Sequence, residues 1–250
     1  MRSLSLFFFF LSQLLYQPTS QSDKIVKQTF DLDGQSRSYY IFVPEKISAH
    51  APLLLVLHGS NMDGRSIVEE WKEIARKEGF IVVGPDSLNP AGWSLETDGP
   101  GFIYALVEAL KAKYQIDARR VYLFGYSAGA VYALQLSMLE SEYFAATAVY
   151  AGAMDPTTYN RVERAKRKIA VALFVGTDDP FFPVPKVKAT RNELKRQGFP
   201  VYMKEFWIDD SLHGHDYHSV AGAVNRESWR FLKGYQLEGE AKFKTYQKEN

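Results

Sequence analysis

The sequence predicts one α/β domain, in which helices cover both faces of a mostly parallel central sheet that begins with an antiparallel hairpin. Short, continuous apolar runs recur along the chain, segments with helical spacing separate them, and two β-rich segments around Asp33-Gly34 come first. Strands that helices bury on both faces lose the alternation of half-exposed strands. This order of elements is therefore typical of consecutive βαβ units.

The hairpin is expected at residues 25–43. Apolar and polar side chains alternate over residues 25–32, and residues 36–43 form a second segment rich in aromatic and β-branched side chains. Asp33-Gly34 between them is a strong two-residue turn signal, because both residue types accept the positive φ that such turns require.

The remaining strands are expected at the apolar runs, which are residues 53–57, 80–83, 121–124, 145–151, 169–175 and 201–208. Segments whose apolar residues have helical spacing lie between these strands or after the last one. They run from Ile67 to Ala75 before Gly79, from Pro100 to an inward-facing Tyr114, around Val187 and Leu194 before Gly198, and over about 219–235. Runs this short, with turn residues on either side, fit buried strands better than buried helices.

Composition excludes several classes of function. The chain has 250 residues, 46% of them hydrophobic and 24% charged, which is close to the average for globular domains. A formal net charge of +1 offers no broad basic surface, so neither nucleic acid nor anionic membrane is an expected partner. Because cysteine is absent, disulfides, thiolate zinc sites and a cysteine nucleophile are impossible.

The first 22 residues are typical of a secretory signal. Arg2 precedes an apolar stretch at residues 4–16, Pro18 ends it, and Ser20-Gln21-Ser22 matches a cleavage signature. The stretch is shorter than the roughly 20 residues of a transmembrane helix. An uncleaved anchor or a buried N-terminal helix is the alternative. We expect a secreted or periplasmic protein without a stable membrane anchor, a catalytic domain at 23–237 and a frayed, charged tail at 238–250.

The strongest chemical motif surrounds Ser127. Gly125-Tyr126-Ser127-Ala128-Gly129 follows an apolar strand directly and precedes a helical stretch. This is the G-x-S-x-G turn in the strand–turn–helix setting that lifts a serine hydroxyl out of the sheet edge as a nucleophile. The N–H of Ala128, at the start of the helix, is then the natural first donor to an oxyanion.

An acid and a histidine complete such a triad, in the chain order Ser, Asp, His. Strand 169–175 leads into Asp178 and Asp179, of which one is expected to be the acid. The loop after strand 201–208 holds three histidines. We choose His215 as the base, with His213 as its rival, and expect His218 to start the final helix.

Other residues are candidates for binding. The turn His58-Gly59-Ser60 follows a central strand, so the Ser60 N–H is expected to be the second oxyanion donor, with His58 as a structural residue. Aromatic side chains beside the motif loops are candidates for lining the substrate pocket: Trp93, Tyr126, Phe181 and Phe182.

Taken together, these segments resemble the secreted esterases of the feruloyl esterase and polyhydroxybutyrate depolymerase type, within the α/β-hydrolase superfamily. The resemblance rests on residues 53–59, Pro85-Asp86, Val121–Gly129, 176–180 and 214–217. It implies Asp179 as the acid and His215 as the base. It also implies cofactor-free hydrolysis of a small-molecule or oligosaccharide ester, such as acyl esters of plant polysaccharide, through an acyl-enzyme. Phe182 replaces a usual valine, and Ala130 a usual glycine.

Three alternatives remain open at this stage. A serine peptidase uses the same triad and differs only in the leaving group. A metallohydrolase could use His213, His215 and His218 as ligands, although this would leave the serine turn unexplained. A non-catalytic relative of the same fold could act as a binding protein.

Overall fold

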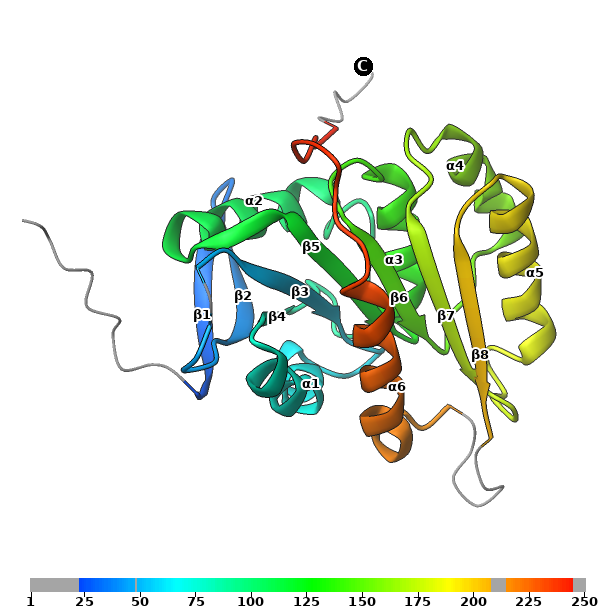
Figure 1. The fold of residues 1–250 in the computed structure, drawn as a ribbon, viewed down its shortest axis with the longest axis horizontal. Helices are drawn as coiled ribbons and strands as arrows, with labels where there is room; N and C mark the ends of the chain where they lie inside the picture. Colours follow the sequence, from blue (N-terminus) through cyan, green and yellow to red (C-terminus); the bar gives the residue numbers. More distant parts are fainter. Residues whose placement is uncertain (1–22, 48, 208–214, 245–250) are drawn as a thin grey trace, which may run out of the picture.

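The computed structural model describes residues 23–47, 49–207 and 215–244. In this part of the chain, one eight-stranded sheet has the order β1-β2-β4-β3-β5-β6-β7-β8 (Figure 1). The strands are β1 (Ile25–Leu32), β2 (Gln35–Phe42), β3 (Ala51–Leu57), β4 (Ile81–Pro85), β5 (Ile116–Tyr126), β6 (Ala146–Tyr150), β7 (Ala170–Gly176) and β8 (Val201–Phe206).

Pairing directions within the sheet match the predicted class. Strands β1 and β2 form the antiparallel hairpin, and β2 also pairs antiparallel with β4. The pairs from β4 through β3, β5, β6 and β7 to β8 are all parallel. The central strands β3, β4, β6 and β7 are buried along their whole length, which explains why their sequences are continuous apolar runs.

Helices cover both faces of the sheet, as predicted. Two of them pack on one face: α1 (Gly64–Glu78) and α6 (Tyr217–Leu232). The opposite face carries α2 (Pro100–Lys113), α3 (Ala128–Leu139), α4 (Tyr159–Arg164) and α5 (Val184–Arg196). A short 3₁₀ helix, η1 (Pro156–Thr158), leads into α4. In Figure 1, α1 and α6 lie together, in agreement with the contacts between them.

The predicted signal peptide at residues 1–22 lies outside the described residues, so it stays a prediction. Within the described ranges, no helix is both long and apolar enough to span a bilayer.

Several predicted boundaries were wrong. Strand β8 ends at Phe206 rather than at residue 208, and Trp207 is 79% exposed. Helix α2 ends at Lys113, so Tyr114 is an extended cap residue rather than a helical one, although its side chain packs against the core as predicted. Helix α6 begins at Tyr217, two residues earlier than expected, because the Asp216 side chain accepts a hydrogen bond from the His218 N–H and caps it. Helix α4 was not predicted.

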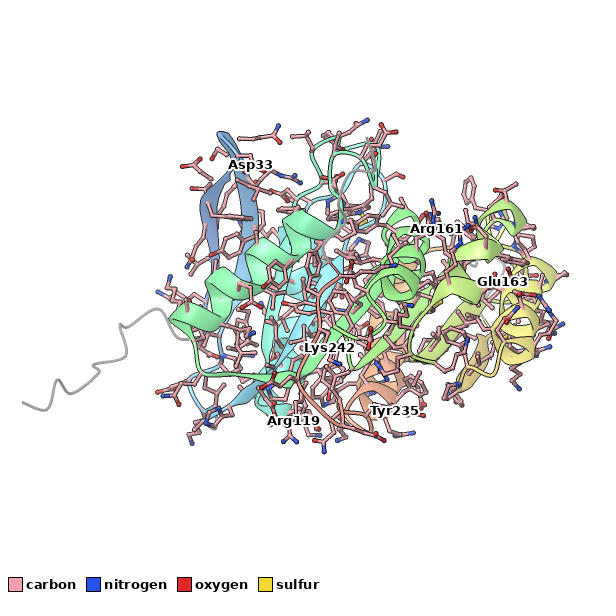
Figure 2. All side chains as sticks on the ribbon, turned by 90° about the horizontal axis from the view of Figure 1, so that it is seen from above. Asp33, Arg119, Arg161, Glu163, Tyr235 and Lys242 are labelled. Atoms are coloured by element: carbon pink, nitrogen blue, oxygen red, sulfur yellow. The ribbon has the colours of Figure 1, made fainter. Side chains whose placement is uncertain are left out.

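The C-terminal segment is packed up to Lys244 rather than frayed. The N–H groups of Leu237 and Lys242 donate to the carbonyls of Arg119 and Glu142 at 3.0 and 3.1 Å. Phe243 stacks on Tyr104 with 4.1 Å between ring centroids. The labelled residues Arg119, Tyr235 and Lys242 mark the path of this segment in Figure 2. It carries the chain from α6 to the face of the sheet that α2 covers.

Candidate active site

Ser127 occupies a strained turn between β5 and α3. Its backbone has φ 53° and ψ −117°, a conformation that is costly for a residue with a side chain. The flanking glycines allow the chain to turn this sharply. A Cβ on Gly125 would lie 2.3 Å from the Gly129 carbonyl oxygen, and one on Gly129 would lie 2.1 Å from the Leu57 carbonyl oxygen. Ser127 is only partly buried.

Three side chains distant in sequence meet at this turn. The Ser127 Oγ lies 3.0 Å from His215 Nε2, and His215 Nδ1 lies 2.9 Å from Asp179 Oδ2. Because a carboxylate only accepts hydrogen bonds, the Nδ1 proton of the neutral ring belongs on the Asp179 side. Nε2 is then free to accept the Ser127 proton. The arrangement has the geometry of a nucleophile, a general base and an orienting acid.

The structure distinguishes the two candidate aspartates. Asp179 is 2% exposed, and its Oδ1 accepts hydrogen bonds from the Phe181 and Phe182 N–H groups at 2.9 and 2.8 Å. These bonds turn Oδ2 towards His215. Asp178 is exposed and accepts a hydrogen bond from Thr177 instead. Only Asp179 therefore contacts the histidine.

His215 is held from several sides. The Tyr126 hydroxyl donates to the His215 carbonyl at 2.9 Å, and burial raises the pKa of Tyr126 to about 12, so this donor keeps its proton. Phe182 stacks beside the imidazole at 6.0 Å, and Phe181 meets it edge-on at 4.9 Å. Of the aromatic candidates for substrate binding, Tyr126 thus uses its hydroxyl to fix the histidine, whereas Phe181 remains 66% exposed.

The predicted oxyanion donors lie on adjoining segments. Gly129 packs against the carbonyls of Leu57 and His58, which brings the start of α3 next to the turn that contains Ser60. The first N–H groups of a helix have no partner within the helix. No hydrogen bond between residues that the structure describes uses the N–H of Ser60 or Ala128. Within the described ranges, both groups therefore have no protein acceptor.

His58 is a structural residue, as the sequence suggested. It is buried; its Nε2 accepts a hydrogen bond from the Ser87 N–H at 3.2 Å, and its Nδ1 lies 2.8 Å from the Gly59 carbonyl. These partners require a neutral ring with the proton on Nδ1. Burial lowers the pKa of His58, in agreement with this form.

Trp93 contacts His58 and lines a cavity beside α3. Its indole N–H donates to the His58 carbonyl at 2.9 Å, and its ring stacks on Tyr132 at 5.1 Å. The cavity has a volume of about 360 Å³, and both Trp93 and Ala128 line it. Because Ala128 directly follows Ser127, this cavity lies beside the serine turn.

The histidines that the metal alternative required make other contacts. His215 bonds to Ser127 and Asp179, and His218 Nδ1 lies 2.6 Å from Glu70 on α1. His213 lies outside the described residues. The contacts of His215 and His218 favour the triad over a shared metal site.

Two supports of the site escaped the sequence analysis. The Tyr126 bond joins residues 89 positions apart, and no local pattern signals it. The other is Gly152, where a Cβ would lie 2.3 Å from the Ala130 Cβ. The extra methyl group of Ala130 after the serine turn is thus accommodated by a glycine two residues after the end of β6.

The fold and this site together define a serine hydrolase of the α/β-hydrolase class. The family model for the dienelactone hydrolase family matches residues 94–220, about half of the chain. The chain belongs to the dienelactone hydrolase family, a family of carboxylic ester hydrolases.

Relatives in sequence and structure agree with this assignment. A bifunctional acetylxylan esterase/xylanase of Neocallimastix patriciarum is 28% identical over 66% of the chain, and feruloyl esterase B of Neurospora crassa is 30% identical over 45%. The matches span only 24% and 43% of those two proteins. The crystal structure of a thermostable esterase shares the fold, with a TM-score of 0.69 and 22% identity over 86% of this chain and 64% of that one. The resemblance drawn from the sequence motifs is confirmed.

Proposed function

We propose that the chain hydrolyses carboxylic esters through an acyl-enzyme formed on Ser127. The hydrogen-bonded series Ser127, His215 and Asp179 carries the proposal. His215 Nε2 takes the hydroxyl proton as Oγ attacks the ester carbonyl carbon. The same proton then passes to the departing alcohol, and a water molecule activated by His215 releases the acid.

The Ser60 and Ala128 N–H groups are proposed to hold the oxyanion. The negative oxygen forms only as the tetrahedral intermediate develops, so these donors stabilise the transition state more than the bound ester. Loss of one such donor costs about 2.7–4 kcal/mol in activation free energy. The positive end of α3, which starts at Ala128, points at the same place.

The proposed substrates are acyl esters of plant polysaccharide or related small esters. Support comes from the relatives, which are named as acetylxylan and feruloyl esterases. The cavity of about 360 Å³ bordered by Trp93 and Ala128 offers room for a small acyl group. The exposed ring of Phe181 beside His215 could stack on a phenolic or sugar ring.

Export from the cytoplasm is also proposed, from the signal-like residues 1–22 alone. The measurement is mass spectrometry of the protein recovered from the medium or periplasm. A new N-terminus near residues 20–22 supports export with cleavage, and an intact Met1 start contradicts it.

Hydrolysis of p-nitrophenyl acetate and feruloyl esters by wild-type protein and by Ser127→Ala tests the mechanism. We expect Ser127→Ala to lose at least 1,000-fold in kcat and to escape labelling by a fluorophosphonate. Ser219→Ala is the matched control, because it removes an exposed hydroxyl on α6 that donates to the Asp216 carbonyl. Retention of more than a tenth of the activity by Ser127→Ala would refute the proposal.

The same preparation separates the alternatives. Faster cleavage of a peptide anilide than of the matched ester would favour a peptidase. Loss of activity with a chelator, but not with the fluorophosphonate, would favour a metallohydrolase. An unlabelled wild-type protein that turns over no ester or amide would favour a binding protein.

A further inference from the structure

A buried ion pair lies outside the triad. Arg37 of β2 and Asp98, which precedes α2, meet at 2.5 Å, with side chains that are 3% and 0% exposed. Removing two charges from water is costly, and a buried pair is on its own weak evidence for stability. The contacts of the pair indicate a role in holding the neighbouring loop in place.

The Asp98 carboxylate organises the loop between β4 and α2. Oδ1 accepts a hydrogen bond from the Leu88 N–H at 2.8 Å, and Oδ2 accepts from the Ser94 N–H at 3.1 Å and the Thr97 hydroxyl at 3.3 Å. One side chain thus ties together the start, the middle and the end of loop 86–99.

Arg37 fixes the same loop from the sheet. Its guanidinium donates to the carbonyls of Thr97 and Asp86 at 3.0 and 3.3 Å. Its planar group also lies 3.6 Å from the centre of the Phe102 ring on α2. With these partners the guanidinium is held in one orientation.

The loop connects the ion pair to the active site through Trp93. Trp93 directly precedes Ser94, stacks on Tyr132, and donates its indole N–H to the His58 carbonyl. The Tyr132 hydroxyl in turn donates to the main-chain carbonyl of Asp98. Two residues after His58 comes Ser60, whose N–H is the proposed oxyanion donor.

We infer that Arg37 and Asp98 are positioning residues, which hold Trp93 and, through its bond to His58, the turn that aims the Ser60 N–H at the oxyanion. The inference rests on the proposed esterase function, because it assigns the pair a role in that same site. Neither side chain touches the reacting atoms. The pair acts by fixing the angle of the peptide units next to Ser60 before substrate arrives.

The test compares Asp98→Asn, Trp93→Phe and their double variant with wild-type protein on one activated ester. Trp93→Phe keeps an aromatic ring next to Tyr132 and removes the donor to His58 together with one ring of the indole. For each single variant we expect kcat to fall about 10- to 100-fold, part of the 100- to 1,000-fold effect of losing a donor outright, with KM changed less than threefold. The double variant should be no slower than the slower single variant, since both changes interrupt one path.

Arg230→Met is the matched control, because it breaks an exposed ion pair with Glu227 on α6. It should leave kcat unchanged. If Asp98→Asn does not fold, as judged by its melting transition, Trp93→Phe alone decides.

The outcomes separate the two hypotheses. Folded single variants with wild-type kcat, or a double variant whose losses multiply, overturn the positioning role while the esterase function stands. A Trp93→Phe variant in which only KM rises also overturns it and makes Trp93 a substrate contact. Wild-type protein without ester turnover overturns the esterase function, and the positioning role with it.

Discussion

In an Asp179→Asn variant, the structure determines which way the amide turns. The Asp179 Oδ1 position accepts two main-chain hydrogen bonds, from Phe181 and Phe182, so the amide oxygen must occupy it. The NH₂ group then faces His215 Nδ1, where the carboxylate oxygen lies 2.9 Å away in the wild-type protein. His215 has to accept at Nδ1 and carry its proton on Nε2. That proton points at Ser127, and the ring cannot act as a base.

The expected magnitude follows from this tautomer. An acid-to-amide change at the equivalent position of a serine triad lowers kcat by about 10⁴, because the geometry survives but the imidazole presents the wrong nitrogen. A factor of 10⁴ corresponds to about 5.4 kcal/mol in activation free energy. Stability should change little, since both main-chain donors to Oδ1 keep an acceptor. The variant should therefore unfold within a few degrees of the wild-type protein.

The assay is steady-state hydrolysis of a p-nitrophenyl ester, together with a thermal melt. Asp178→Asn is the matched control: it makes the same chemical change one residue away, at an exposed carboxylate that accepts a hydrogen bond from Thr177. We expect it to retain at least half of the wild-type kcat. An Asp179→Asn variant within tenfold of wild-type activity, or an equal loss in Asp178→Asn, would refute the reasoning.

Other contacts give further predictions. Gly152→Ala should lower the free energy of unfolding, measured by denaturant titration, by about 1–3 kcal/mol, because the new Cβ would lie 2.3 Å from the Ala130 Cβ. Adding Ala130→Gly to this variant should restore the stability. Tyr126→Phe should lower kcat several-fold and stability by about 1 kcal/mol, because His215 loses a donor to its carbonyl. Burial raises the pKa of Glu140 from 4.5 to about 7. The free energy of unfolding should therefore fall as the pH rises from 4.5 through 7. In Glu140→Gln this pH slope should be absent when the melting temperature is measured at a series of pH values.

Each of these has a matched control. Gly101→Ala adds a methyl group in open space on α2 and should not destabilise the protein. Tyr122→Phe removes a bond from a hydroxyl to the Tyr235 carbonyl, so it should match the stability loss of Tyr126→Phe without changing kcat. Glu142→Gln removes a neighbouring charge that raises the pKa of Glu140 less than burial does, so it should reduce the pH slope without abolishing it. The first prediction is contradicted if Gly152→Ala unfolds like the wild-type protein, and the second if both tyrosine variants lose kcat equally. The third is contradicted if Glu140→Gln keeps the pH slope.

Sequence periodicity predicted the sheet because the central strands are buried on both faces, so that burial alone determines their composition. Helix α4 was missed for the opposite reason. It is six residues long and buries only Val162, which is too little for a repeating pattern. The tail shows the limit of composition. Its charged residues suggested fraying, but the described part, up to Lys244, is held by the ring of Phe243, by the bond from the Lys242 N–H to the Glu142 carbonyl and by the bond from the Lys244 N–H to the Glu140 carboxylate.

The serine turn could be predicted because all its requirements are local: a strand, two glycines and a helix within a few residues. The choice between Asp178 and Asp179 could not be made from local pattern. Both residues follow the same strand. They differ in that the N–H groups of Phe181 and Phe182 donate to the carboxylate of Asp179 and orient it towards His215. In the sequence analysis, only the resemblance to known esterases favoured Asp179.

The ion pair of Arg37 and Asp98 spans 61 positions, and no sequence pattern signalled it. In β2, Arg37, Tyr39 and Ile41 are spaced by two and therefore share one face of the strand, and the structure buries all three. A buried guanidinium requires an anionic or carbonyl partner. The identity of the partner depends on sheet order, because β2 pairs with β4 and the Asp86 N–H bonds to the Ser38 carbonyl at 3.0 Å. That pairing brings loop 86–99 close to Arg37. The order of strands in the sheet cannot be derived from the local pattern of a single sequence.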